Sequence, residues 1–145
     1  MFEIREILTG DTEEITRLSA QLGYPNSVQK ISRLIRTIQA DLENMVYVAQ
    51  VGETVLAGFV HIFLTNRLFI DPFAEVGGLI VDERYRGTGL GGDLLTQAEN
   101  WAVEKGCAEM RVRSNIIRED AHKFYIARGF AIVKKQTVLL KTFTD

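Results

Sequence analysis

The stretch that decides the fold is Arg84-Tyr85-Arg86-Gly87-Thr88-Gly89-Leu90-Gly91-Gly92, which carries four glycines in its last six residues. It follows an apolar run, Phe73 to Val81, typical of a strand buried on both faces, and it precedes a helical pattern. Glycines let successive backbone N–H groups turn to one side, and a helix start adds unpaired donors and a positive dipole end. The stretch therefore predicts an anion cradle, most naturally for a pyrophosphate, to which Arg84 and Arg86 can add charge-assisted bonds.

The glycines also match the G-x-G-x-x-G pattern of a dinucleotide-binding Rossmann unit, at Gly87, Gly89 and Gly92. That unit needs an acidic residue about 20 residues further on, at the end of the next strand. Here the next predicted strand ends in Arg111-Val112-Arg113-Ser114, and only 32 residues of the chain follow Arg113. Because a second mononucleotide half does not fit into 32 residues, the Rossmann interpretation fails.

The composition is that of an ordinary globular protein. With 145 residues, 46% hydrophobic and 25% charged, the chain is expected to fold as a single domain over residues 1–145. A net charge of -2 argues against a dedicated nucleic-acid binder. The single Cys107 cannot form an intramolecular disulfide, and neither a signal peptide nor an apolar run near ~18 residues is found. We therefore expect a cytoplasmic protein with no membrane partner.

The residue patterns predict alternating strands and helices. The strand patterns start at Phe2 and continue over Met45–Val51, Thr54–Leu64, Phe73–Val81, Ala108–Arg113 and Phe130–Lys141. The helical patterns follow the N-caps Asp11 (with Glu14 in capping-box register) and Ser27, start again near Gly89, and cover Glu119–Arg128. Gly52-Glu53 suits a two-residue hairpin turn, and Gly77-Gly78 suggests a bulge.

These motifs together resemble the GNAT superfamily of acetyl-CoA-dependent N-acetyltransferases, over nearly the whole chain. Within it, the run from Ser114 to Tyr125 is most similar to the branch that acetylates small amines, such as aminoalkylphosphonates and aminoglycosides. The residues that carry the resemblance are Glu75, Arg84–Gly91, Ser114-Asn115, Ala121-His122-Lys123-Phe124-Tyr125 and Gly129-Phe130. The implied fold is α/β, with a mixed, mostly antiparallel sheet that splays between its fourth and fifth strands and helices on both faces.

The resemblance implies acetyl-CoA as co-substrate, lying in that splay. Its pantetheine arm would bond to the strand backbone at Leu79 and Val81, on either side of Ile80, as β-augmentation by a small molecule. Asn115 would contact the pantetheine region, or act only as a turn or cap residue. The pyrophosphate would bind the loop residues Arg84, Arg86, Gly87, Thr88, Gly89, Leu90 and Gly91.

The resemblance also implies two catalytic side chains. Acyl transfer to an amine needs a neutral amine and a proton for the departing thiolate. Tyr125 matches the family's acid, and its alternative is core packing. Glu75 matches the base of histone-acetylating relatives and could act directly, act through a water, bind the cationic amine, or be a solvated strand residue. In many small-amine relatives the glutamate lies three residues later, and here that position is Gly78.

The remaining expectations concern the acceptor and other chemistry. The acceptor is expected to be a small-molecule primary amine; a peptide N-acetyltransferase or a non-catalytic acyl-CoA-binding module are the alternatives. Arg67 and Asp71 are candidates for acceptor contact. Cys107 is expected to be a small core residue, and His61 and His122 lack the spacing of metal ligands, so no metal is expected. Since relatives are often dimers, a homodimer remains open.

Overall fold

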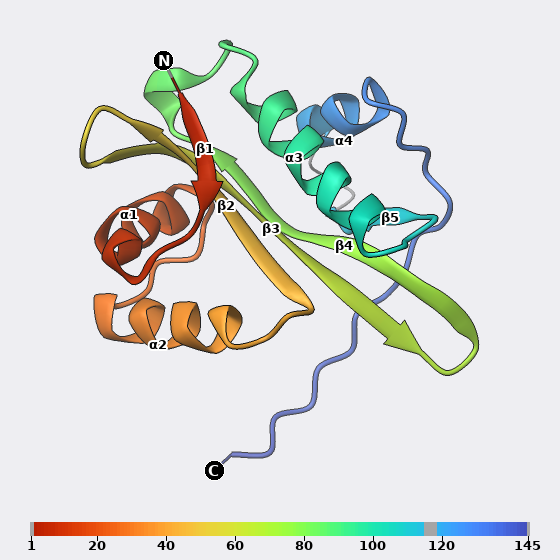
Figure 1. The fold of residues 1–145 in the computed structure, drawn as a ribbon. Helices are drawn as coiled ribbons and strands as arrows, with labels where there is room; N and C mark the ends of the chain where they lie inside the picture. Colours follow the sequence, from red (N-terminus) through yellow and green to blue (C-terminus); the bar gives the residue numbers. More distant parts are fainter. Residues whose placement is uncertain (1, 115–118, 145) are drawn as a thin grey trace. The chain divides into compact units, whose positions relative to one another are not determined.

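The structure is a computed structural model that describes residues 2–114 and 119–144 (Figure 1). The chain divides into two compact units, Met1–Arg113 and Ser114–Asp145. The first unit is built on a five-stranded sheet with the strand order β1-β2-β3-β4-β5. Neighbouring strands pair antiparallel except β4 and β5, which are parallel. The predicted mixed, mostly antiparallel α/β fold is therefore confirmed.

Most element bounds lie within a few residues of those expected from the sequence. The strands are β1 (Glu3–Glu6), β2 (Asn44–Val51), β3 (Val55–Arg67), β4 (Ile70–Val81) and β5 (Met110–Val112). The helices are α1 (Thr12–Gln21), α2 (Val28–Gln39), α3 (Leu90–Glu104) and α4 (Glu119–Ile126), with 3-10 turns at Thr9–Asp11 and Glu83–Tyr85.

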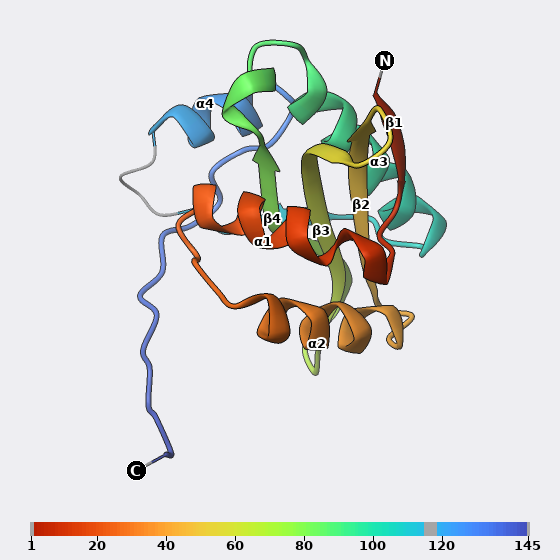
Figure 2. The same cartoon turned by 90° about the vertical axis from the view of Figure 1, so that its left-hand side faces the viewer.

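Helices cover both faces of the sheet. Figures 1 and 2 show α1 and α2 on one face and α3 on the other. The α1/α2 face is packed through Leu18, Ile31, Val48 and other buried apolar side chains of both layers. α3 packs against β2, β3 and β4 through its buried stripe, which consists of Leu90, Leu94, Leu95, Ala98, Trp101 and Ala102. The apolar periodicities of these helices thus predicted the buried faces, except at Leu34 of α2, which is exposed.

Three local expectations at helix starts and turns are corrected. Asp11 stands at the start of α1 but its carboxylate does not cap that helix; it pairs with Arg5 at 2.9 Å and accepts the Leu8 N–H. The β2–β3 turn spans residues 52–54, one residue longer than expected, because Val51 pairs with Val55. The stretch from Asn66 to Pro72 has no clear periodicity, yet β3 and β4 extend into it and meet in a tight hairpin, with Arg67 paired to Ile70. The pairing between the two strands stabilises this stretch, which the sequence pattern alone does not predict.

β4 carries a bulge and then parts from β5. His61 pairs with Gly78 while the next residue, Ile62, pairs with Val76, so Gly77 is the extra residue, as predicted from the two glycines. β5 pairs with β4 only at Ala74, Glu75 and Val76, and it ends at Val112. Among the described residues, positions 77–81 of β4 therefore have no strand on the β5 side, which is the predicted splay.

The second unit contains α4 and the chain that follows it. The closing strand predicted over Phe130–Lys141 is wrong: residues 130–144 are described and form no strand. A β-rich composition makes a strand only where a neighbouring strand accepts its backbone bonds, and none pairs with this segment among the described residues. No helix in residues 2–114 and 119–144 has the length and apolarity needed to cross a membrane.

Candidate functional site

The predicted anion cradle forms at the start of α3. Gly87 and Gly89 adopt left-handed backbone angles, with φ of 79° and 87°, and α3 begins directly after Gly89. In the described part of the chain, no protein acceptor is recorded for the backbone N–H groups of residues 89–92, where α3 begins. A row of unpaired donors at the positive end of a 15-residue helix is suited to bind a phosphate group.

The side chains of this loop hold its shape by bonding to the protein. Thr88 Oγ1 donates to the Tyr85 carbonyl at 2.6 Å, and Arg86 Nε donates to the Val81 carbonyl at 3.2 Å. The Arg84 guanidinium donates to Asp82 Oδ2 at 3.1 Å. In the structure both arginine side chains connect the loop to the end of β4, and the bonds to phosphate expected from the sequence stay a prediction.

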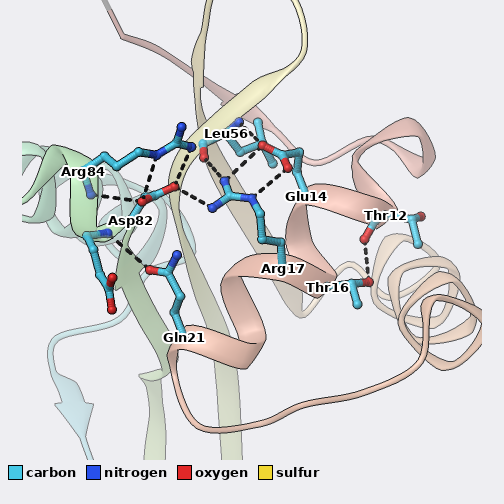
Figure 3. Close-up of polar contacts among 9 residues, drawn as sticks. Thr12, Glu14, Thr16, Arg17, Gln21, Leu56, Asp82 and Arg84 are labelled. Carbon is cyan, nitrogen blue, oxygen red and sulfur yellow. Dashed lines mark hydrogen bonds and ion pairs between the residues drawn. The ribbon is translucent and has the colours of Figure 1, made fainter.

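A buried carboxylate lies at the centre of this arrangement (Figure 3). Asp82 is 1% exposed and accepts the Arg84 N–H at 3.0 Å and Arg17 Nη1 at 2.6 Å. Arg17, on α1, also donates to the Glu14 carboxylate and to the Leu56 carbonyl of β3. Further along α1, Gln21 accepts the Glu83 N–H. One face of α1 is therefore joined to β3 and to the residues that open the loop.

These bonds change the acidity of Asp82. Burial by itself raises the pKa of its carboxyl group, but hydrogen bonds from the Arg84 side chain, from the Arg84 N–H and from Arg17 outweigh burial. The pKa of Asp82 is therefore held well below its usual range, so that the group is ionised in the folded protein at any pH where the fold is stable.

Asp82→Asn is expected to destabilise the protein at neutral pH and to weaken its acid dependence. The pKa of Asp82 is lower in the folded protein than in the unfolded chain, where it is about 3.9. The ionised group therefore stabilises the folded state at pH values above about 3.9, and this stabilisation is lost as the pH falls further. We expect a free energy of unfolding about 1–3 kcal/mol lower than wild type at pH 7, with the difference shrinking below about pH 4. Urea unfolding from pH 2 to 7 measures it, with the exposed Glu53→Gln as control. A difference independent of pH contradicts the ionised assignment.

The strand segment expected to hold pantetheine leads into this loop. Leu79, Ile80 and Val81 pair with Val60, Phe59 and Gly58 of β3. A Cβ on Gly58 would lie 2.5 Å from the Ile80 carbonyl oxygen and 3.2 Å from Leu94 Cδ1, so only glycine fits between β4 and α3. Residues 79–81 are therefore held on their β3 edge by strand pairing and close packing. On their other edge, beyond the end of β5, no strand pairs with them among the described residues.

Glu75 is well inside the first unit and has two partners. Its side chain is 12% exposed; Thr65 Oγ1 donates to Oε1 at 3.2 Å, and Arg113 Nε lies 3.2 Å from Oε2. The carboxylate therefore has neighbours that fix its orientation. Two further arginines, Arg67 and Arg111, lie over the nearby Phe73 ring, at 5.8 and 4.1 Å from its centroid.

The other candidate residues belong to the second unit or are not described. Tyr125 lies in α4, where its ring contacts Phe124 and Phe130 edge to face, at 5.1 and 5.4 Å between centroids. These contacts are what the packing alternative requires, and they leave the role of its hydroxyl as a prediction. His122 lies in the same helix. Asn115 falls outside the described residues. In the first unit, Cys107 is only half-buried and is not part of the core as expected, and this burial raises the pKa of its thiol.

Sequence reasoning missed Asp82, Arg17 and the environment of His61. The only local signal for Asp82 was an acidic residue between an apolar strand and Arg84. Arg17 looked like one more exposed helix charge, because its partners Asp82 and Leu56 are 65 and 39 residues away. His61 was regarded as isolated for the same reason, since its partner Asn44 lies in the neighbouring strand.

Comparison with known families identifies the chain. Residues 5–130 match the family model described as the acetyltransferase (GNAT) family. The chain is 26% identical over 112 residues to aminoglycoside N(6')-acetyltransferase type 1 of Serratia marcescens, which covers 74% of this chain and 77% of that protein. It is 38% identical over 56 residues to the aminoalkylphosphonate N-acetyltransferase of Salmonella typhimurium, over 39% of this chain and 36% of the relative.

Solved structures share the fold over almost the full chain. A structure titled as a transcriptional regulator from Bacillus halodurans C-125 superposes with a TM-score of 0.87 at 24% identity, covering 97% of this chain and all of that chain. AAC(6')-Iy in complex with the bisubstrate analogue CoA-S-monomethyl-acetylneamine gives a TM-score of 0.85 at 20% identity, over 98% and 99% of the two chains. These likenesses concern the fold.

The chain belongs to the acetyltransferase (GNAT) family, because the family model covers most of its length. It is similar to aminoglycoside N-acetyltransferases. The resemblance drawn from the glycine loop and the run to Tyr125 is thus confirmed, and so is the prediction of an N-acetyltransferase enzyme.

Proposed function

We propose that this protein transfers the acetyl group of acetyl-CoA to the primary amine of a small molecule by direct attack, and that residues 1–145 form one domain for this purpose. The observation that carries the proposal is the row of unpaired N–H groups at residues 89–92, which follows a β4 segment without a β5 partner among the described residues. The family match over residues 5–130 supports both parts.

The residues of this region fit the co-substrate. The backbone of Leu79 and Val81, flanking Ile80, would hold the pantetheine arm, because β4 offers peptide groups there that no strand covers on the β5 side among the described residues. Within the loop from Arg84 to Gly91, the unpaired N–H groups from Gly89 onward would hold the pyrophosphate, because the Arg84 and Tyr85 N–H groups already donate to Asp82. Acetyl-CoA supplies a thioester carbonyl that a neutral amine can attack.

The chain's own groups would handle the protons and the amine. The Glu75 carboxylate, oriented by Thr65 and Arg113, would receive the acceptor amine, either as a base or by attracting the ammonium ion. The Tyr125 hydroxyl would give its proton to the leaving sulfur. Holding amine and thioester side by side would contribute much of the rate.

A small amine is proposed as the acceptor because the relatives named for their substrates are aminoglycoside and aminoalkylphosphonate N-acetyltransferases. CoA release with neamine, 2-aminoethylphosphonate, putrescine and a tetrapeptide, at equal acetyl-CoA, tests this. We expect turnover with at least one of the three small amines. Turnover confined to the peptide contradicts the small-amine proposal, and CoA binding without any turnover favours a binding module.

Glu75→Gln is expected to lower activity about five- to tenfold at neutral pH, and the kinetic parameters tell the two roles apart. If the carboxylate removes the proton, kcat falls and part of it returns as the pH rises toward the pKa of the amine, because free amine then becomes abundant. If the carboxylate attracts the ammonium ion, KM for the amine rises and kcat is preserved. Thr65→Val is the matched control, since it removes only one partner of Glu75. Unchanged kcat and KM would exclude Glu75 from the site.

A further inference from the structure

His61 lies on the same face of the sheet as Glu75. Phe63 pairs with Glu75, and His61 is two residues before Phe63, so all three side chains project from one face. His61 itself pairs with Gly78 next to the bulge, and a Cβ on Gly78 would lie 3.6 Å from Leu22 of α1. His61 therefore belongs to the face covered by α1 and α2, beside two residues without side chains.

The hydrogen bonds around His61 determine which ring nitrogen carries the proton. Asn44 Nδ2 donates to Asp41 Oδ2 at 3.0 Å, which fixes the amide so that its oxygen faces the ring. That oxygen, Oδ1, lies 2.8 Å from His61 Nε2, and an amide oxygen can only accept. Nε2 therefore carries the hydrogen in neutral His61, and Nδ1 keeps the lone pair.

Nδ1 has an unused lone pair among the described residues. No described residue bonds to it, and because no buried side-chain nitrogen or oxygen lacks a partner among these residues, Nδ1 is in contact with solvent. It lies 2.8 Å from the place that a Cβ on Gly77 would occupy, so the ring lies directly against the bulge. An alanine at Gly77 would collide with it.

The ring is also in the state that a base requires. Burial lowers the pKa of His61 and is the only cause acting on it, so no charged group acts on the ring directly. On the β2 side of the ring lies Asn44, whose amide donates to Asp41. On the same face of β4 lies Glu75, whose carboxylate is bonded to Thr65 and Arg113. Leu22, at the end of α1, lies beside the neighbouring Gly78. At pH 7 the imidazole is therefore neutral.

We propose that His61 is the general base for the acceptor amine. The N–H bond of the bound ammonium ion breaks, its electron pair stays on the nitrogen, and the proton goes to Nδ1, while the Asn44 amide oxygen accepts from Nε2 and stabilises the imidazolium. Glu75 then binds the ammonium ion and orients it. This assignment rests on the proposed acetyl transfer to a small amine, and it names the residue that makes the amine reactive.

The test replaces His61 by Gln, whose amide can still donate to Asn44 but cannot take a proton. With neamine, 2-aminoethylphosphonate or putrescine as acceptor, we expect kcat at pH 7 to fall about a hundredfold and both KM values to stay within about twofold. The lost rate is expected to return in part at high pH. The control is Glu53→Gln, an exposed residue of the β2–β3 turn, and this variant is expected to keep wild-type kinetics.

A second variant serves if the first does not fold. Asn44→Asp combined with Asp41→Asn keeps a hydrogen-bond donor between these two side chains and puts a carboxylate against Nε2, so the acid limb of the pH–rate profile is expected to move up by about one unit. An NMR titration of the wild type is expected to show the Nε2–H form of His61, with an imidazole pKa below 6.5.

Three results would overturn the assignment of His61 as the base. They are a wild-type kcat in His61→Gln, an acid limb that does not move in the second variant, and the Nδ1–H form in the NMR titration. Absence of wild-type turnover with every amine overturns the proposed function instead.

Discussion

Tyr125→Phe is expected to slow the acetyl-transfer step by about ten- to a thousandfold while acetyl-CoA binding changes little. The substitution removes only the hydroxyl. The ring contacts with Phe124 and Phe130 persist, because they involve the ring faces and edges that phenylalanine retains. A rate loss without a loss of helix packing would therefore support our proposal that the hydroxyl supplies a proton to the leaving sulfur.

Pre-steady-state rates are the proper measurement for this variant, since slow product release can hide a slower chemical step. Tyr24→Phe is the matched control, because it removes the same hydroxyl group from a tyrosine that is 66% exposed and lies in another part of the chain. A chemical step as fast as that of wild type would assign Tyr125 to packing alone.

Gly89→Val is expected to lower the affinity for CoA by about tenfold or more, which is at least about 1.4 kcal/mol. At φ of 87° a β-branched residue is strained, and a Cβ at Gly89 would meet no protein atom within 4 Å. The new side chain would therefore occupy the space in front of the unpaired N–H groups, where we propose that phosphate binds. Titration calorimetry with CoA measures the loss, and circular dichroism checks the fold.

Gly106→Val provides an unusually close control for this prediction. Gly106 has a φ of 83°, also has open space around it, and follows the C-terminal end of the same helix. A valine at position 106 is strained in the same way but does not face the proposed phosphate site. The CoA affinity of the Gly106→Val variant is therefore expected to equal that of wild type. Equal losses in the two variants would attribute the effect to helix strain and contradict the cradle.

The features that could be predicted from the sequence are those that depend only on residues close together in the chain. The loop around Gly87 and Gly89, the bulge at Gly77 and the N-cap at Ser27, whose Oγ accepts the Lys30 N–H, depend on local backbone conformation. Residues 130–141 misled the prediction, because a strand depends on a partner strand that its own sequence does not specify.

Within the candidate site, the groups that sequence patterns miss are those with distant partners. Asp82 is held as a buried anion by its neighbour Arg84 and also by Arg17, which reaches it from another element. The tautomer of His61 follows from Asn44 and, behind it, from Asp41, two groups that only the pairing of β2 with β3 brings to the ring. Periodicity records which side faces the core, but not which polar groups meet there.

The two glycines at the bulge differ in the side chain that they tolerate. A Cβ at Gly77 would lie 2.8 Å from His61, whereas one at Gly78 would lie at an ordinary contact distance, 3.6 Å from Leu22. The fold can therefore accept a methyl group at Gly78 but not at Gly77. Any side chain at position 77 would displace the His61 ring, so the position of the proposed base depends on a single glycine of the neighbouring strand.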